Sequence, residues 1–218
     1  MFGMFRGGWK QIALLGGATL IVIVLFHQAI AQAFRGDPVF QAGGRLLAQG
    51  RQVLDSPPIY FAPDHNLERL DIDRLRRTRS RLDISMYAFT DRELAEVLKE
   101  LAGRGTVIRL YRDQEQFAWE QAQARGGFGN TTALLRGVLR LHIRVKGGAR
   151  RDLMHQKDYC IDCDGASGVL REGSANWSVG AERFQDNALW FTSNPSETEV
   201  FERKFEEMWA RPSNRIVQ

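Results

Sequence analysis

The sequence predicts an α/β protein in which a mixed β-sheet lies between helices and is preceded by an N-terminal hydrophobic helix. A strand over residues 82–89, a helix and a strand over 106–111 follow one another, and such a unit forms a right-handed parallel crossover. Farther on, residues 155–161 read as an extended segment, a Gly-rich turn follows at 164–168, and 169–172 return as a second strand. Parallel and antiparallel pairs together make the predicted sheet mixed.

The remaining elements follow from helix caps and apolar periodicity. Asn66 is predicted to cap one helix, Thr90 to open the helix of the crossover through a capping box with Glu93, and Asn194-Pro195 to begin the last helix. The other predicted elements are strands over 59–62, 141–145 and 188–191, helices over 114–124 and 131–140, and a last helix to Trp209 with the apolar stripe Val200, Phe201, Phe205, Met208 and Trp209. These helices suffice to cover both faces of the sheet.

The first 58 residues are predicted to lie outside the folded domain, which spans 59–218. Residues 1–34 combine basic residues, the apolar run 12–26 and an Ala-x-Ala site, which is the pattern of a cleaved signal peptide. The same segment is long enough to be an uncleaved signal anchor. Residues 35–58 read as a linker. Both alternatives place the domain outside the cytoplasm, in the periplasm, secreted or anchored to the membrane, because the flanking positive charges stay inside.

The composition indicates which class of partner the protein binds and what role its two cysteines have. Of the 218 residues 44% are hydrophobic, which excludes global disorder, and the formal net charge of +4 favours a polyanionic partner, either nucleic acid or an anionic lipid surface. Cys160 and Cys163 lack a second ligand pair for zinc. An extended i to i+3 pair spans roughly 10 Å, too far for a disulfide unless a turn at Asp162 folds the chain back. We therefore expect two unpaired cysteines packed beside a strand.

The stretch from Met154 to Asn176 carries the chemistry. Alternation places His155 and Lys157 on one face of the extended segment, and the returning strand delivers Ser174 and Asn176 close to His155. An imidazole, a fixed cation, and hydroxyl and amide donors on a tight turn suit a tetrahedral anion, because the donors hold its oxygens while the imidazole attacks or protonates. Phosphodiester cleavage is the reaction that this set of groups predicts.

These motifs resemble the signature of the phospholipase D superfamily, which includes phospholipases, small bacterial endonucleases and mitochondrial outer-membrane relatives. The resemblance rests on His155-x-Lys157-x4-Asp162 followed by Gly173-Ser174-x-Asn176. It extends from about Ile59 to Arg211: residues 83–90 are similar to the family's early core strand, and Asp186 stands where the family usually carries glutamate. The interval between Asp162 and Gly173 is longer than the common family spacing, which implies an extended hairpin.

The resemblance implies a metal-independent phosphodiesterase without a cofactor that acts through a phosphohistidine. Relatives with one copy of the motif pair two subunits, so it also implies a homodimer with one composite active site. His155 of one subunit would attack phosphorus and His155 of the other would protonate the leaving group. Lys157 and Asn176 would hold the phosphoryl oxygens, Ser174 would assist as a donor, and Asp186 would accept a hydrogen bond from the second imidazole nitrogen.

Residues around the motif receive binding or structural roles. Alternation directs Asp162 away from the reacting pair, so we expect it to hold the turn. Lys146, Arg150 and Arg151, on the loop before the motif, are candidates for contacts with the substrate backbone, and a solvated loop is the alternative. Asp113 follows the strand over 106–111 and is expected to be an ordinary turn residue.

Three functions stay open, in this order: an endonuclease on DNA or RNA, a phospholipase D acting on phosphatidyl head groups or cardiolipin, and a catalytically inactive nucleic-acid or membrane-binding module. The single motif copy, the small size and the basic loop favour the endonuclease. The apolar N-terminal segment would keep a lipid enzyme at its substrate, and a basic surface would attract anionic lipid. Intact His155, Lys157, Ser174 and Asn176 argue against the inactive module.

Overall fold

A computed structural model describes residues 59–124, 131–149, 151–165 and 168–217. Every described residue belongs to the unit Pro57–Gln218, one of the two units into which the chain divides. The predicted signal segment over 1–34, the linker up to residue 58 and Arg150 lie outside the described residues. Of the helices that are described, none is both long and apolar enough to cross a membrane.

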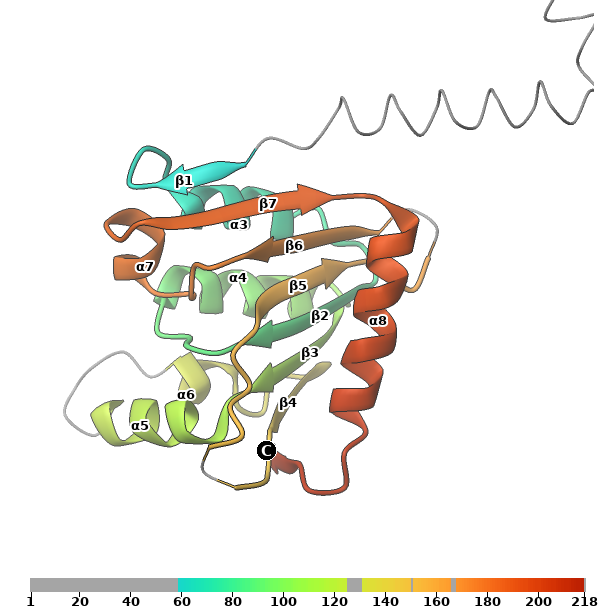
Figure 1. Cartoon of the computed structure of the whole chain (residues 1–218). Coiled ribbons are helices and arrows are strands. Elements are labelled where there is room, and N and C mark those ends of the chain that lie inside the picture. The colour runs from blue at the N-terminus through green and yellow to red at the C-terminus, as the bar shows by residue number, and fades with distance from the viewer. Residues whose placement is uncertain (1–58, 125–130, 150, 166–167, 218) are drawn as a thin grey trace, which may run out of the picture. The chain divides into compact units, whose positions relative to one another are not determined.

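The described chain forms one eight-stranded mixed sheet (Figure 1). Its strands are β1 (Tyr60–Ala62), β2 (Arg81–Met86), β3 (Val107–Arg112), β4 (Leu141–Val145), β5 (Lys157–Ile161), β6 (Val169–Gly173), β7 (Asn187–Thr192) and β8 (Arg215–Val217). Their order across the sheet is β1-β7-β6-β5-β2-β3-β4-β8. Strands β2, β3 and β4 run parallel, and all other neighbours are antiparallel. Both the predicted crossover and the predicted hairpin are confirmed.

Helices cover the two faces of this sheet. They are α3 (Leu67–Leu75), α4 (Arg92–Gly103), α5 (Gln114–Ala124), α6 (Thr131–Leu135), α7 (Val179–Arg183) and α8 (Pro195–Trp209). In Figure 1, α3 and α4 lie behind the sheet and α8 lies on the opposite face, so the predicted sandwich is confirmed. The predicted helix over 131–140 was too long: Gly137 and Arg140 have φ angles of 73° and 68°, which a right-handed helix does not contain.

The N-terminal caps of three helices were predicted, and one of them was placed one residue too early. Asn66 and Asn194 cap α3 and α8 as expected. The cap of α4 is Asp91 rather than Thr90, because its carboxylate accepts hydrogen bonds from two amides of the first turn. Val200 does not belong to the buried stripe of α8: its side chain is 56% exposed, since a step of one residue turns it about 100° away from buried Phe201.

Strand β5 is buried on both faces. Its Tyr159 belongs to the main core, which packs between the sheet and α3 and α4. The next residue, Cys160, points to the opposite face and packs with Phe205 and Trp209 of α8. All five residues of β5 are buried. The strand that leads to the motif is therefore fixed from both sides.

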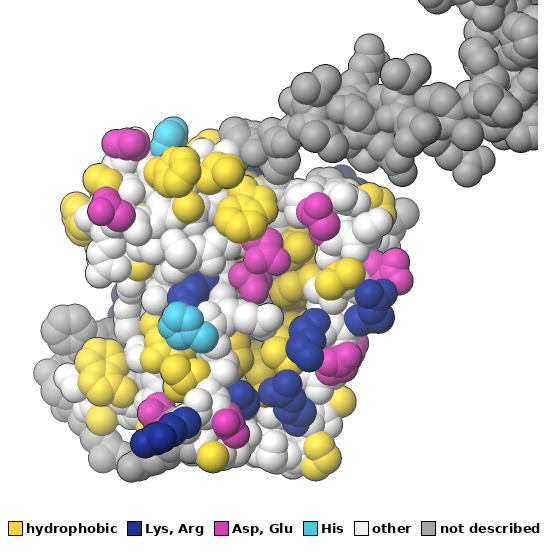
Figure 2. All heavy atoms as spheres, in the orientation of Figure 1, with side chains coloured by type: hydrophobic (Ala, Val, Ile, Leu, Met, Phe, Trp, Pro, Cys, Tyr) yellow, Lys and Arg dark blue, Asp and Glu magenta, His cyan; other side chains and the backbone are white. Residues whose placement is uncertain are grey.

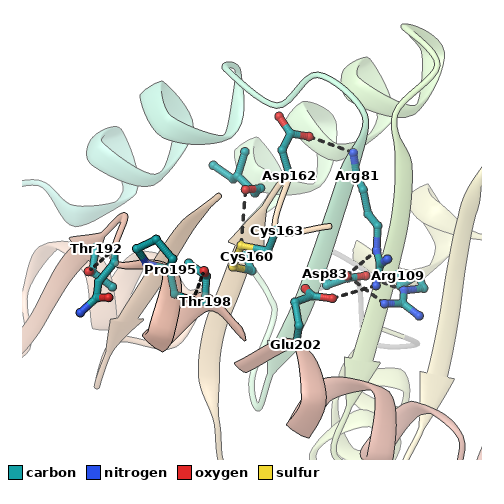
Figure 3. The surroundings of a disulfide bond; sticks show 12 residues. Arg81, Asp83, Arg109, Cys160, Asp162, Cys163, Thr192, Pro195, Thr198 and Glu202 are labelled. Atoms are coloured by element: carbon teal, nitrogen blue, oxygen red, sulfur yellow. Dashed lines mark hydrogen bonds and ion pairs between the residues drawn. A yellow bond between two sulfur atoms is a disulfide. The ribbon is translucent and has the colours of Figure 1, made fainter. Parts of the chain in front are cut away.

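Cys160 and Cys163 form a disulfide, so the prediction of two unpaired cysteines was wrong (Figure 3). Their Cα atoms are 5.7 Å apart, well below the separation in an extended segment. Asp162, between them, has a φ angle of 50°, and this left-handed conformation, which aspartate tolerates better than most residues, folds the chain back. The turn at Asp162 that the sequence left open as an exception is present.

Candidate active site

His155 and Lys157 come together where β5 begins. The Nζ atom of Lys157 lies 3.0 Å from Nδ1 of His155 and donates a 2.6 Å hydrogen bond to the carbonyl oxygen of His155. The imidazole is exposed, whereas Lys157 is only 6% exposed. An ammonium group can only donate, so Nδ1 acts as the acceptor and a neutral ring carries its proton on Nε2.

The surroundings lower the pKa of both groups. Burial lowers the pKa of Lys157 to about 8, with Asp158 acting in the opposite direction and Arg171 lowering it further. Partial burial also lowers the pKa of His155, the charge of Lys157 lowers it further, and Asp113 opposes the shift. A neutral imidazole near pH 7 is the form that a nucleophilic histidine requires.

Tyr87 meets this pair from the end of β2. The centroid of its ring is 4.6 Å from that of His155, and Nζ of Lys157 lies 5.1 Å from the same ring. Its amide donates a 2.9 Å hydrogen bond to the carbonyl oxygen of Gln156, between the two reacting residues. Tyr87 therefore restricts the orientation of both side chains. The sequence placed Tyr87 on a core strand and did not identify this role.

Asn176 is held at the same end of the sheet. Its Oδ1 accepts a 3.2 Å hydrogen bond from the Ala88 amide, and the Trp177 amide donates to the carbonyl oxygen of Ala88 at 3.1 Å. Ala88 directly follows Tyr87, so the turn is fixed beside the ring that contacts the imidazole. The NH₂ group of Asn176 has no hydrogen-bond partner among the described residues, and it can donate to a substrate oxygen.

Ser174 is used differently from the prediction. Its Oγ donates to Oδ1 of Asn187 at 2.8 Å and accepts from the Ala188 amide at 3.1 Å. Both hydrogen bonds join the end of β6 to the start of β7. Because the hydroxyl proton points to Asn187, this geometry assigns Ser174 to holding the turn rather than to donation toward a phosphoryl group.

Asp186 is exposed, and within the described part of the chain no hydrogen bond joins it to His155. The predicted contact with the second imidazole nitrogen is therefore absent from this arrangement. An aspartate side chain is one methylene shorter than the glutamate that the family usually carries at this place. The structure instead uses the neighbouring Asn187, through its bond to Ser174, to connect this loop to the turn.

Asp113 is more than a turn residue. It is 1% exposed, and its carboxylate accepts hydrogen bonds from the amides of Glu115 and Gln116 at the start of α5 and from the Met154 amide, each at 2.9 Å. Because Met154 directly precedes His155, Asp113 ties the segment that carries the imidazole to the end of β3. Its charge also raises the pKa of the imidazole.

Asp162 lies at the opposite end of β5. Its carboxylate accepts hydrogen bonds from the amides of Arg79, Ser80 and Arg81 and from the hydroxyl of Ser80, at distances of 2.9 to 3.3 Å (Figure 3). Burial alone would raise the pKa of Asp162, but these donors bring it below its ordinary value. The position and contacts agree with the structural role predicted for Asp162.

A buried ion pair supports the site from the core. Arg171 and Asp71 are fully buried and 3.1 Å apart. Arg171 also donates to the carbonyl oxygens of Lys157 and Ala175, and Asp71 accepts from the indole N–H of Trp177 at 3.0 Å. One ion pair thus connects the strand of the lysine to the turn of the asparagine. This ion pair was not predicted from the sequence, although Asp71 lies four positions from Leu67 and from Leu75, on the apolar side of the helix.

The basic loop is only partly described. Lys146 donates a 3.2 Å hydrogen bond from Nζ to the carbonyl oxygen of Leu153, and Arg151 is exposed. Arg150 lies outside the described residues. The loop that precedes His155 therefore presents at least one exposed basic side chain, and contact with a substrate stays a prediction.

One cluster of three potential metal ligands occurs among the described residues: Cys160, Cys163 and Glu202. Its two sulfur atoms are bonded to each other, so they are not thiolate ligands. The cluster lies at the disulfide end of β5.

With this geometry in place, comparison with known proteins decides the family. Residues 72–209 match the family model described as "Cardiolipin synthase, PLD-like domain", which covers more than half of the chain and all of the motif residues. The chain belongs to this phospholipase D-like family. The human protein named mitochondrial cardiolipin hydrolase is 26% identical over 135 residues, or 62% of this chain. The chain spans about half, 48%, of the length of that relative.

Solved structures share the phospholipase D-like fold of this chain. NucT from Helicobacter pylori has a TM-score of 0.61 at 21% identity, over 73% of this chain and 97% of that one. Nuc from Salmonella typhimurium, described as a phospholipase D family member, has a TM-score of 0.58 at 18% identity, over 75% and 98%. At these identities the likeness shows the fold.

The phospholipase D-like site is open to solvent and mixed in chemistry. Figure 2 shows hydrophobic, acidic and basic side chains interspersed on the face seen in Figure 1, without a single sign of charge dominating it. Leu153, two residues before His155, is 46% exposed. Within one chain the described site brings together one imidazole, one ammonium and one amide donor. Attack and leaving-group protonation on opposite sides of a phosphorus atom need a second acid–base group.

Proposed function

We propose that the chain is a phosphodiesterase that acts through a phosphohistidine intermediate. The observation that carries the proposal is the exposed imidazole of His155, whose Nδ1 lies 3.0 Å from Nζ of the nearly buried Lys157. A cation at that distance holds a phosphoryl oxygen next to the attacking ring. The NH₂ group of Asn176 supplies a second donor without a charge.

The reaction proceeds in two displacements. Nε2 of His155 attacks phosphorus, so that a P–N bond forms while the bond to the leaving oxygen breaks and that oxygen receives a proton. Water then attacks phosphorus, its proton passes to the group that had acted as the acid, and the P–N bond breaks. Attack through Nε2 requires the proton on Nδ1, and this becomes possible when the ammonium of Lys157 turns from Nδ1 to a substrate oxygen.

In this proposal His155 of a second copy of the chain supplies the acid, in its protonated imidazolium form, and regains its proton from the attacking water. The two His155 side chains would face each other across one substrate, and the subunits would form a homodimer with a composite site. What supports this is the exposure of His155, together with the absence of a second histidine near it among the described residues.

We infer that the substrate is nucleic acid and that the enzyme is an endonuclease. The basic loop supports this choice, because Arg151 is exposed next to the motif and Lys146 is held to the same loop by its bond to Leu153. Cations on a loop beside a phosphodiesterase site suit the backbone of a polyanion.

A second candidate is hydrolysis of a phospholipid head group or cardiolipin. Two exposed apolar side chains favour it: Leu153 at 46%, close to His155 in the chain, and Phe184 at 72%, on the loop that carries Asp186. The relative named mitochondrial cardiolipin hydrolase adds support. An apolar rim is what a site must present to a substrate that stays in a bilayer.

We propose a location outside the cytoplasm, in the periplasm or attached to the membrane through residues 1–34. The disulfide between Cys160 and Cys163 supports this location, because disulfides persist in oxidising compartments.

The test is cleavage by the purified full chain in EDTA, with single-stranded DNA, duplex DNA, RNA and anionic phospholipid vesicles offered in parallel. We expect cleavage of nucleic acid by the wild type, loss of cleavage in His155→Ala, and full activity in His65→Ala, which removes an exposed histidine elsewhere. An acid-labile covalent adduct with labelled substrate should form only when His155 is present. Release of a lipid head group alone would support the second candidate, and silence on every substrate would overturn the proposed activity.

A further inference from the structure

A basic pocket lies at the end of β4 that is distant from the active site. Strand β4 begins at Leu141 in this pocket and ends at Val145, next to the loop that leads to His155. The pocket has a volume of about 560 Å³. We call it the edge pocket, and the lining residues that matter here are Arg136, Arg140, Arg144, Leu139, Trp209 and Ile216.

The arginines of the edge pocket lack acidic partners. No ion pair joins Arg136, Arg140 or Arg144 to a carboxylate among the described residues. Some exposed arginines elsewhere do have such a partner, as Arg92 has Glu96, while others, such as Arg77 and Arg79, have none among the described residues. Arg144 donates from Nη1 to the carbonyl oxygen of Trp209, which anchors its guanidinium group without neutralising it. The pocket therefore keeps an excess of positive charge.

Aliphatic side chains protrude between these cations. Leu139 is 80% exposed, the largest value among the exposed large hydrophobic residues of the described chain, and it directly precedes Arg140. Ile216 is 62% exposed and stands opposite Arg144 in the register of β4 and β8, so both side chains lie on one face of the sheet.

We propose that the edge pocket docks the domain on an anionic membrane surface. The guanidinium groups of Arg136, Arg140 and Arg144 would receive acidic lipid head groups, while Leu139 and Ile216 enter the apolar boundary below them. Clustered cations gain free energy near anionic lipid, and an aliphatic side chain gains more when it leaves water for the acyl region. Leu139, exposed between Arg136 and Arg140, provides the aliphatic side chain, and the two arginines provide the positive charge.

The same surface is poorly suited to nucleic acid. Non-specific binding of single strands relies on open aromatic faces on which bases stack. The pocket contains two aromatic rings, the exposed imidazole of His142 and the indole of Trp209, and Trp209 is 9% exposed. Its ring is covered by Arg144 at 4.6 Å, by Arg109 at 5.4 Å and by the stacked ring of Phe205 at 5.6 Å. The indole of Trp209 is therefore not free for stacking, and His142 is the one exposed ring among the described lining residues, whereas Leu139 and Ile216 both protrude.

The experiment places a photoreactive side chain at the exposed leucine of the full chain. Leu139→p-benzoylphenylalanine is mixed with vesicles of phosphatidylglycerol and phosphatidylcholine, or of phosphatidylcholine alone, and irradiated. The matched control is Val200→p-benzoylphenylalanine, because Val200 is also an exposed aliphatic residue, at 56%, but its neighbours Glu199 and Arg203 form an ion pair. Lipid adducts are counted by mass spectrometry.

We expect lipid adducts at position 139 in anionic vesicles and few at position 200. Adding Arg136→Gln and Arg140→Gln should lower the yield at position 139 about fivefold or more, as should removal of the anionic lipid. Equal yields at the two positions, no dependence on the arginines, or adducts with added nucleic acid or a second protein chain instead of lipid would each overturn the proposal. This experiment measures lipid adducts and not cleavage, so it tests membrane docking independently of the proposed enzymatic activity.

Discussion

The two ends of β5 contain residues of the same sequence motif, yet they are built on opposite principles. At the end with His155, an exposed imidazole faces an ammonium that burial makes less basic, and the NH₂ group of Asn176 has no described partner. At the end with Asp162, one carboxylate accepts hydrogen bonds from three amides and a hydroxyl. A disulfide between Cys160 and Cys163 closes the turn around it.

One motif therefore serves two purposes. Groups that must bind a substrate are left with unused hydrogen-bonding capacity, and this costs stability. Groups that fix the strand are fully bonded, and this makes them useless to a substrate. The four predictions below test this division, beginning with the largest expected effect.

Replacing the lysine should affect activity and leave the fold intact. Lys157→Met removes the cation next to His155, and we expect kcat to fall by about 10³-fold, the loss typical for removal of one group that stabilises transition-state charge. The melting temperature should stay equal or rise, because the substitution removes an ammonium whose charged form burial disfavours. Steady-state kinetics and calorimetry on the same preparation measure both quantities. A clear drop in melting temperature would contradict the division.

Replacing the aspartate should do the reverse. Asp162→Ala leaves the amides of Arg79, Ser80 and Arg81 without their acceptor, and we expect the free energy of unfolding to fall by about 2 kcal/mol. The kcat of the folded fraction should stay within about threefold of the wild type, since no reacting group is lost. Urea titration followed by an activity assay checks this, and Asp162→Asn, which keeps one acceptor oxygen, should lie between the two. A large loss of kcat in folded protein would place Asp162 in the chemistry.

Tyr87 tests whether the catalytic end is positioned by packing. Tyr87→Leu removes the ring that contacts His155 and Lys157, and we expect kcat to fall about tenfold with little change in KM, because orientation rather than binding is lost. Tyr87→Phe keeps the ring and should restore most of the activity. An equal loss in both variants would instead point to a role for the hydroxyl group.

The pH dependence should show the depressed pKa of Lys157. An ordinary lysine, with a pKa of 10.5, keeps its charge to high pH, whereas a pKa of about 8 means that the cation is lost as pH rises through 8. We expect kcat/KM to fall at least about fourfold between pH 7 and pH 8.5. Lys157→Arg, which stays charged, should show lower activity but no such alkaline decline. A flat profile in the wild type across that range would contradict the lowered pKa.

Sequence patterns were enough to predict most of the helices and strands, although α7 and β8 were not predicted, and to propose the residues of the site. The spacing of apolar residues identified the crossover, the hairpin and the final helix. Burial of one face of a strand or helix places apolar residues at regular intervals in the sequence. His155 and Lys157 are two residues apart, so strand alternation places them on one face. Asp162 is an odd number of residues from both, so alternation directs it to the other face. These conclusions held because each depends on the geometry of one short segment.

Contacts between segments that are distant in the sequence could not be predicted from local patterns. Tyr87 reaches the imidazole because β2 pairs with β5, and Asp113 reaches Met154 across a long interval of sequence. The left-handed turn at Asp162 brings Cys160 and Cys163 close enough to form the disulfide. This turn is stabilised by hydrogen bonds from the amides of Arg79 and Ser80, which are distant from Asp162 in the sequence. Hydrogen bonds and packing between strands depend on register, and register is set by the whole sheet rather than by any local pattern.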